Sequence, residues 1–144
     1  ESVDSIHKKL GHIMWEYVGM GRTQEGLETG LKKIAELRKE FNEHVRIPGE
    51  KEGLNVELDK AIRLRDFLTM GELVAYDALN RNESCGGHFR EESQTEEGEA
   101  KRDDENYMYV ACWKYNGSDT EAPTLLKEDL NYQYIKVQTR NYKS

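Results

Sequence analysis

The chain has 144 residues, of which 34% are charged and 36% hydrophobic, and its formal net charge is −7. This length suits one domain with a modest core, and the acidic balance offers no basic face for nucleic acid or for anionic lipid. No apolar run approaches the roughly 18 residues that span a bilayer, so the sequence predicts no transmembrane helix.

The first predicted helix covers about residues 4–18, because apolar residues recur there at helical spacing. Asp4 or Ser5 is its expected cap, and Gly19 and Gly21 are expected to end it through the left-handed exit that glycine adopts cheaply. Its buried stripe is predicted to consist of Ile6, Leu10, Ile13, Met14 and Val18.

The second predicted helix follows a cap at Thr23 and runs to about residue 46. Gly26 and Gly30 lie one turn apart near its start, where each costs up to about 1 kcal/mol relative to alanine. Close packing against another segment would explain both glycines. The predicted buried stripe consists of Leu27, Leu31, Ile34, Phe41 and Val45, with Leu37 beside it.

The third predicted helix starts after a cap at Asn55 and ends near Asn80. Short connections force neighbouring helices to run antiparallel, so the three helices predict an up-down-up, spectrin-repeat-like three-helix bundle. The buried stripe of the third helix is assigned to Leu58, Ile62, Arg65, Leu68 or Thr69, Leu73 and Val74, widened by Ala61, Ala75, Ala78 and Leu79.

A polar junction at residues 81–90 separates the helices from a different kind of sequence. Residues 91–105 contain eight acidic and two basic side chains, which supply −6 of the net charge, and we expect a mobile loop. Residues 107–115 and 132–139 are rich in aromatic and β-branched residues and are predicted to pair as antiparallel strands. The predicted fold class is therefore mainly α, with a bundle at residues 1–82 followed by an acidic loop and a short antiparallel β-ribbon at 83–144.

The junction concentrates the side chains that could carry chemistry. Cys85 and His88 have a spacing usable for a metal or for a thiolate and its base. Structural zinc needs about four ligands, however, and catalytic Cys and His normally meet through the fold, so a structural loop is favoured. Asp103 and Asp104 could serve acid–base work, but neighbouring carboxylates in an acidic run are solvated, and a clamp on an arginine is favoured.

The basic residues of the junction allow two interpretations. Arg81, His88 and Arg90 could face an anionic substrate or a redox cofactor held by another domain, or they could fix the loop. Glu83 and Asp103 are the expected partners of these arginines, because carboxylates accept paired hydrogen bonds from guanidinium groups.

The ends and the cysteines of the chain also carry expectations. Cys85 and Cys112 are the only cysteines and, without a signal peptide, are expected to be reduced thiols in a cytoplasmic setting. Because the chain begins on Glu1 rather than Met, we expect a fragment or a processed product.

Residues 81–106 resemble the C-terminal region of the succinate dehydrogenase and fumarate reductase flavoprotein subunits. In that family the junction reads Arg-x-Glu-Ser-Arg-Gly-Ala-His-x-Arg-x-Asp-x-Pro and is followed by Arg-Asp-Asp-x-Asn-Trp. The matching positions are Arg81, Glu83, Ser84, Gly86, His88, Arg90, Arg102, Asp103, Asp104 and Asn106. The departures are Cys85, Gly87, Glu92, Gln94 and Tyr107, with an insertion of several residues within 95–101. The run Met14-Trp15-Glu16-Tyr17-Val18-Gly19, followed by Gly21-Arg22, is similar to the start of the family's helical domain.

That resemblance implies a scaffold, because the family binds FAD and substrate in preceding domains. The full subunit would interconvert succinate and fumarate through FAD, whereas this chain alone is expected to be inactive and to hold neither cofactor nor metal. The implied partners are the upstream FAD-binding domain, an iron-sulfur subunit and a membrane anchor subunit, with no nucleic acid. The implied location is cytoplasmic and peripheral on the inner membrane.

The resemblance also marks residues expected at an interface or near the site of the full subunit. They are Arg81, Glu83, Ser84, His88, Arg90, Arg102, Asp103 and Asp104. Residues 83–144 are expected to pack on the bundle or on the absent flavin domain. Cys85 cannot form the bidentate pair available to the family's usual arginine.

Two alternatives stay open. One is the C-terminal domain of an aspartate oxidase-type flavoprotein, a relative of the same family. The other is a free-standing acidic interaction module that binds a basic partner through residues 91–105. The Arg-Asp-Asp-x-Asn half of the motif and the aromatic tail favour the succinate/fumarate branch.

Overall fold

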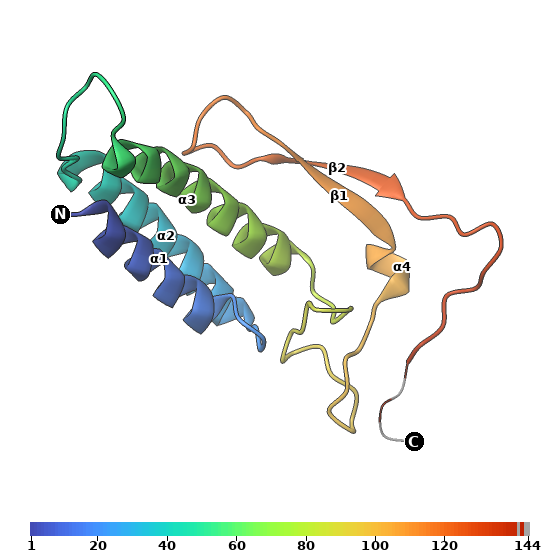
Figure 1. The fold of residues 1–144 in the computed structure, drawn as a ribbon. Coiled ribbons are helices and arrows are strands. Elements are labelled where there is room, and N and C mark those ends of the chain that lie inside the picture. The colour runs from blue at the N-terminus through green and yellow to red at the C-terminus, as the bar shows by residue number, and fades with distance from the viewer. Residues whose placement is uncertain (141, 143–144) are drawn as a thin grey trace. The chain divides into compact units, whose positions relative to one another are not determined.

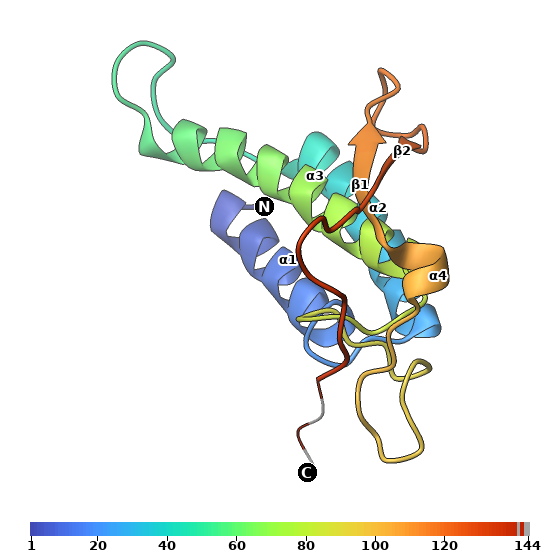
Figure 2. The same ribbon diagram turned by 90° about the vertical axis from the view of Figure 1, so that its right-hand side faces the viewer.

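The computed structural model describes residues 1–140 and 142 and divides into two compact units, Glu1–Asn80 and Arg81–Ser144. The first unit contains three helices, α1 (Val3–Tyr17), α2 (Gln24–His44) and α3 (Val56–Asn80), which pack against one another side by side (Figures 1 and 2). The predicted three-helix bundle is therefore confirmed. Among the described residues, none of the helices combines the length and the apolar composition needed to cross a bilayer.

Each long helix begins at a polar side chain that accepts a backbone hydrogen bond one turn on. Thr23 Oγ1 accepts from Gly26 N at 3.0 Å, and Asn55 Oδ1 accepts from Leu58 N at 3.1 Å, so both predicted caps are confirmed. The cap of α1 is Ser2 instead of Asp4 or Ser5, because the helix starts one residue earlier than expected.

The predicted left-handed exit from α1 is wrong. Val18 caps the helix, and neither Gly19 nor Gly21 has a positive φ. Gly19 has a different reason to lack a side chain, since a Cβ there would lie 2.5 Å from the carbonyl oxygen of Trp15.

The core of the bundle confirms the first two predicted stripes and corrects the third. Ile6, Leu10, Leu27 and Ile34 are buried. On α3 the buried positions are Ala61, Leu64, Leu68, Gly71, Ala75 and Ala78. Leu58, Ile62 and Val74, which were assigned to the core, are exposed. The reason is that α3 carries apolar residues on several sides, so the spacing of its apolar residues does not identify the buried face. The buried face is the one on which small residues allow the neighbouring helices to approach closely.

The second unit holds a four-residue helix α4 (Asp104–Tyr107) and two antiparallel strands, β1 (Tyr109–Lys114) and β2 (Thr124–Asp129). The antiparallel ribbon is confirmed, but its second strand is not the predicted segment 132–139. The chain pairs with the nearer segment because Asn116 closes the intervening turn. Its Nδ2 donates to Ala122 O at 2.7 Å and to Thr124 Oγ1 at 3.0 Å.

The acidic segment is folded, contrary to the expected mobile loop. Gln94 and Ala100 form an antiparallel bridge, Thr95 N donates to Glu99 O at 2.8 Å, and Lys101 N donates to Ser93 O at 3.1 Å. Polar turn residues supply these bonds, so the segment needs no apolar core to hold its shape.

Candidate functional site

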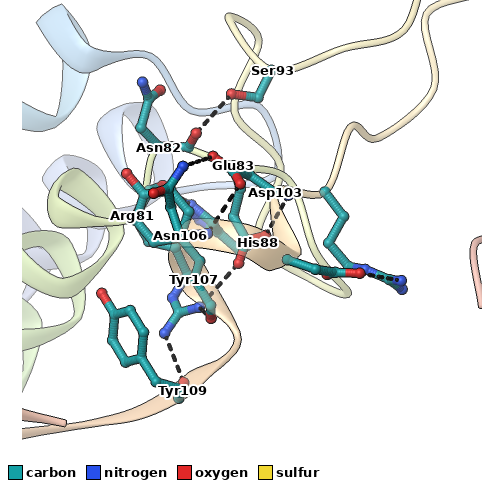
Figure 3. Close-up of polar contacts among 11 residues, drawn as sticks. Arg81, Asn82, Glu83, His88, Ser93, Asp103, Asn106, Tyr107 and Tyr109 are labelled. Atoms are coloured by element: carbon teal, nitrogen blue, oxygen red, sulfur yellow. Dashed lines mark hydrogen bonds and ion pairs between the residues drawn. The ribbon is translucent and has the colours of Figure 1, made fainter. Parts of the chain in front are cut away.

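The junction predicted from sequence forms a polar network around Glu83, which is 2% exposed. Glu83 Oε1 accepts from Arg81 NH1 at 2.9 Å, and Glu83 Oε2 accepts from Asp103 N at 2.9 Å (Figure 3). One carboxylate thus joins the start of the junction to the far end of the acidic segment. Hydrogen bonds that involve an ionised group are stronger than those between neutral groups, so the bond to Arg81 suits this junction.

Arg81 ties the same carboxylate to the start of the ribbon. Its NH1 also donates to Tyr107 O at 2.7 Å and its NH2 to Tyr109 O at 3.2 Å. The guanidinium carbon lies 4.8 Å from the centre of the Tyr109 ring and 5.7 Å from that of Tyr107. The flat, weakly hydrated guanidinium suits this stacking, and a lysine could not reproduce both the forked donors and the stacking.

His88 closes the junction loop onto its own beginning. Its Nε2 lies 2.7 Å from the carbonyl oxygen of Arg81, so Nε2 carries the proton and donates. Cys85 and His88 also exchange both backbone hydrogen bonds, at 2.8 and 3.1 Å. The loop is therefore closed by the backbone as well as by the imidazole.

Ser84 and Arg90 form the buried centre of the loop. Arg90 N donates to Ser84 Oγ at 2.8 Å, and Ser84 Oγ donates to Arg90 O at 3.1 Å. The Arg90 residue is 1% exposed, and its Nε donates to Glu92 Oε2 at 3.1 Å. A buried guanidinium requires such carboxylate or carbonyl partners, because leaving its charge desolvated and unpaired would cost several kcal/mol.

The adjacent aspartates have separate tasks. Asp103 caps α4, accepting from Asn106 N at 3.2 Å and from Asn106 Nδ2 at 2.9 Å. Asp104 holds Arg102 through two parallel bonds of 2.6 and 2.8 Å, and the hydrogen bonds to Asp104 raise the pKa of Arg102. The expected clamp on an arginine is therefore made by Asp104, whereas no hydrogen bond joins Asp103 to an arginine in the described part of the chain.

The structure brings most of the predicted site residues into one network. Arg81, Glu83, His88 and Asp103 are linked directly or through one neighbour, as are Ser84 with Arg90 and Arg102 with Asp104. The carbonyl groups of Tyr107 and Tyr109 and of Gln138 were missed. Sequence could have drawn attention to the two closely spaced tyrosines as stacking platforms, but a backbone acceptor leaves no sequence signal.

The polar groups of this network are used to hold chain segments together and are not arranged as a reaction centre. Both oxygens of Glu83 accept from donors of this chain, and the Arg81 guanidinium donates to three acceptors of this chain. Among the described residues, no group of three or more His, Cys, Asp or Glu side chains could hold a metal ion. Cys85 and Cys112 are free and exposed.

The described residues do not form a dinucleotide-binding fold. A dinucleotide fold binds its pyrophosphate where a strand leads through a glycine turn into a helix. Here β1 continues into β2 through a hairpin connection, and no strand in the described part of the chain leads into a helix.

Comparison with known proteins gives a family match over nearly the whole chain. Residues 7–142 match the family model described as fumarate reductase flavoprotein C-term. A fumarate reductase flavoprotein subunit of a Serratia species is 32% identical over 142 residues, covering 99% of this chain and 23% of the relative. A chloroplastic L-aspartate oxidase of Nicotiana tabacum is 38% identical over 85 residues, covering 58% of this chain and 13% of the relative.

A solved structure has the same fold. A structure of quinol-fumarate reductase with menaquinol molecules superposes with a TM-score of 0.79 at 29% identity, covering 94% of this chain and 22% of that chain. The chain thus spans less than a quarter of the length of the relatives it matches. The fuller coverage by the Serratia subunit favours the fumarate reductase branch over the aspartate oxidase alternative.

Proposed function

We propose, because this chain belongs to the family of fumarate reductase flavoprotein C-terminal domains, that it is the scaffolding domain of an FAD-dependent subunit interconverting succinate and fumarate. The redox chemistry would belong to the remaining part of such a subunit, and this chain alone would have no activity. The family match also argues against the free-standing acidic module.

The observation that supports the scaffolding role is that the two carboxylate oxygens of Glu83 bind two different segments of the chain. This buried carboxylate joins Arg81 to the backbone of Asp103 and so fixes the junction, the acidic segment and α4 as one body. Such preorganisation suits a surface that must hold one geometry against a partner. We propose that the partner is the upstream FAD-binding domain and that residues 81–104 lie at or near that interface.

The remaining partners follow from the same proposal. A subunit of this kind would pass electrons to an iron-sulfur subunit and associate with a membrane anchor subunit. It would lie on the cytoplasmic side of the inner membrane as a peripheral component. The quinol-fumarate reductase among the similar structures supports assembly into such a complex.

The test compares the full-length subunit with a version that lacks residues 1–144 and with residues 1–144 alone. We expect the full-length subunit to retain FAD and to reduce fumarate with a reduced viologen dye. The truncated version should lose FAD or activity. Residues 1–144 alone should neither bind FAD nor reduce fumarate. A separate domain that bound flavin stoichiometrically and oxidised succinate would contradict the proposal.

Glu83→Ala in the full-length subunit tests the proposed fastening. Removal of the carboxylate leaves Arg81 and the Asp103 amide without their acceptor, so we expect weaker flavin retention at an unchanged fold. Glu91→Ala is the matched control, since the Glu91 side chain lies on the exposed part of the acidic segment. Equal flavin retention in both variants would contradict the proposed role of Glu83 in fixing the junction.

A further inference from the structure

The segment after β2 has the sequence of a strand without the pairing of one. Ribbon pairing ends where Leu130 N donates to Met108 O at 3.1 Å, and among the described residues no backbone-to-backbone hydrogen bond reaches 131–139. The trace runs on from β2 without further regular structure (Figure 1). Its side chains are nevertheless those of a strand, with tyrosines, Ile135, Val137 and Thr139 within eight residues.

These side chains are more exposed than such residues usually are. Tyr134 is 89% exposed and Ile135 is 67% exposed. An extended segment that presents apolar side chains and unpaired peptide groups is a template for pairing with another strand. It contains no proline, so each of its residues retains a backbone N–H donor.

We propose that residues 132–139 add as a strand to an exposed sheet edge in the upstream part of the same polypeptide. This inference rests on the proposed function, in which most of the subunit precedes this domain. Strand addition of this kind obtains affinity from main-chain hydrogen bonds and specificity from alternate side chains.

Two observations favour an edge of the same polypeptide. The relatives are more than four times as long as the stretch matched here, so a subunit of that kind holds most of its residues outside this domain. Arg102 NH1 donates to Gln138 O at 3.0 Å, which tethers the segment to its own unit and limits its reach. A short tether gives a nearby edge of the same chain a high effective concentration.

Charge adds a constraint on the recipient edge. Residues 130–140 contain Lys136 and Arg140 and no acidic side chain, although the whole chain has a net charge of −7. Opposite charges on neighbouring strands stabilise pairing, so acidic side chains should flank the recipient edge.

The Arg102 contact also determines which edge of the segment is available. In an extended strand, the N–H and C=O of one residue point to the same side, and successive residues alternate. Because the carbonyl of Gln138 points toward Arg102, Tyr134 and Lys136 direct their peptide groups to that side in the strand form. Gln133, Ile135 and Val137 then present theirs to the opposite edge, where the recipient strand would pair.

Hydrogen–deuterium exchange of the full-length subunit tests this alternation. We expect the wild-type segment 132–139 to exchange at least about 100-fold more slowly than an unpaired chain. Ile135→Pro removes a pairing N–H and should abolish this protection. Lys136→Pro, the matched control, removes an N–H that faces away from the recipient and should leave the protection within about threefold of wild type.

Three results would overturn the inference. The first is a wild-type segment that exchanges as fast as an unpaired chain. The second is protection that appears only after the iron-sulfur subunit is added, which would assign the edge to another chain. The third is equal loss of protection in the two proline variants.

The FAD content and fumarate reduction of the same wild-type preparation separate this inference from the proposed function. A flavin-loaded, active subunit with an unprotected segment contradicts only the strand addition. An inactive subunit without flavin contradicts the proposed function, while the exchange rates still decide whether the strand forms.

Discussion

At the scale of single residues, Glu83 decides the shape of the junction. Its neighbours in sequence are Asn82 and Ser84, and the motif-like spacing identified it as a partner for arginine. The Arg81–Glu83 pairing is confirmed at 2.9 Å. The second bond, from the amide of Asp103, joins residues 20 positions apart and could not be read from local sequence.

Replacement of this carboxylate should be costly to stability. We expect Glu83→Ala to lower the free energy of unfolding by about 2–4 kcal/mol, because two partly buried donors lose a buried acceptor and one of them is charged. Urea unfolding followed by circular dichroism measures the loss. Glu91→Ala should change stability by less than about 0.5 kcal/mol, as surface substitutions usually do. A Glu83→Ala value as small as that of the control would show that water replaces the carboxylate.

Glycine at position 30 is explained by the neighbour it allows. A Cβ on Gly30 would lie 2.9 Å from the Cβ of Tyr17, so the close packing predicted from sequence is confirmed there. Gly26 differs, because its Cβ would meet the Oγ1 of the capping Thr23 at 2.9 Å.

Two glycine-to-alanine substitutions should therefore have opposite effects. Gly30→Ala should destabilise the bundle by about 1–3 kcal/mol through overpacking against Tyr17. Gly11→Ala should stabilise it by up to about 1 kcal/mol, since nothing lies within 4 Å of its Cβ and alanine favours the helix. Thermal unfolding of the two variants gives the comparison, and changes of the same sign would contradict it.

At the scale of elements, α3 marks where sequence reasoning reached its limit. Its existence, start and end were predicted correctly, because Asn55 caps it and a polar junction follows it. The face of α3 that is buried was predicted wrongly. The buried face uses Ala61, Gly71 and Ala75, which give a weaker apolar signal than the exposed Ile62 and Val74.

The two faces of α3 should respond differently to truncation. Leu68 is 1% exposed and Ile62 is 48% exposed. We expect Leu68→Ala to lower the free energy of unfolding by about 2–5 kcal/mol through a cavity, and Ile62→Ala by less than about 1 kcal/mol. Denaturant titration decides between the faces. A larger loss of unfolding free energy from Ile62→Ala than from Leu68→Ala would support the buried face expected from sequence.

The ribbon was misassigned for a different physical reason. β2 contains Lys127, Glu128 and Asp129, which residue preferences place outside strands. It is nevertheless paired, because the closed turn places it beside β1. In addition, Lys127 Nζ lies 4.5 Å from the centre of the Tyr109 ring. Chain proximity and one cation–π contact outweigh intrinsic preference here.

At the scale of the whole molecule, the segment after the ribbon contributes little within this chain. Its described contacts are the bond from Arg102 to the Gln138 carbonyl and a 3.3 Å bond from Tyr142 N to Glu99 Oε1. Both partners are solvent-accessible, so water can replace the lost bonds.

A chain that ends after Leu130 should consequently keep its stability. We expect its Tm to differ by less than about 2 °C from that of the complete 144-residue chain. Differential scanning calorimetry of the two chains measures this. A larger fall would mean that residues 131–144 stabilise this domain directly, and would weaken the case that their pairing partner lies elsewhere.

The overall architecture was easier to predict than the details of the site. Helical period and caps were sufficient for three helices, because those signals are local. The family motif selected the junction residues, and the structure gathers most of them. The acceptors contributed by Tyr107, Tyr109 and Gln138 depend on the path of the backbone, which local sequence does not encode.

The two free thiols have a practical consequence for following this domain during assembly. Cys85 lies on the junction and Cys112 on the outward side of β1, and both are exposed. Nitroxide labels attached to this native pair would report, by dipolar spectroscopy, the spacing between loop and ribbon without any engineered substitution. A spacing that narrows in distribution when the remaining polypeptide is present would reveal rigidification on docking.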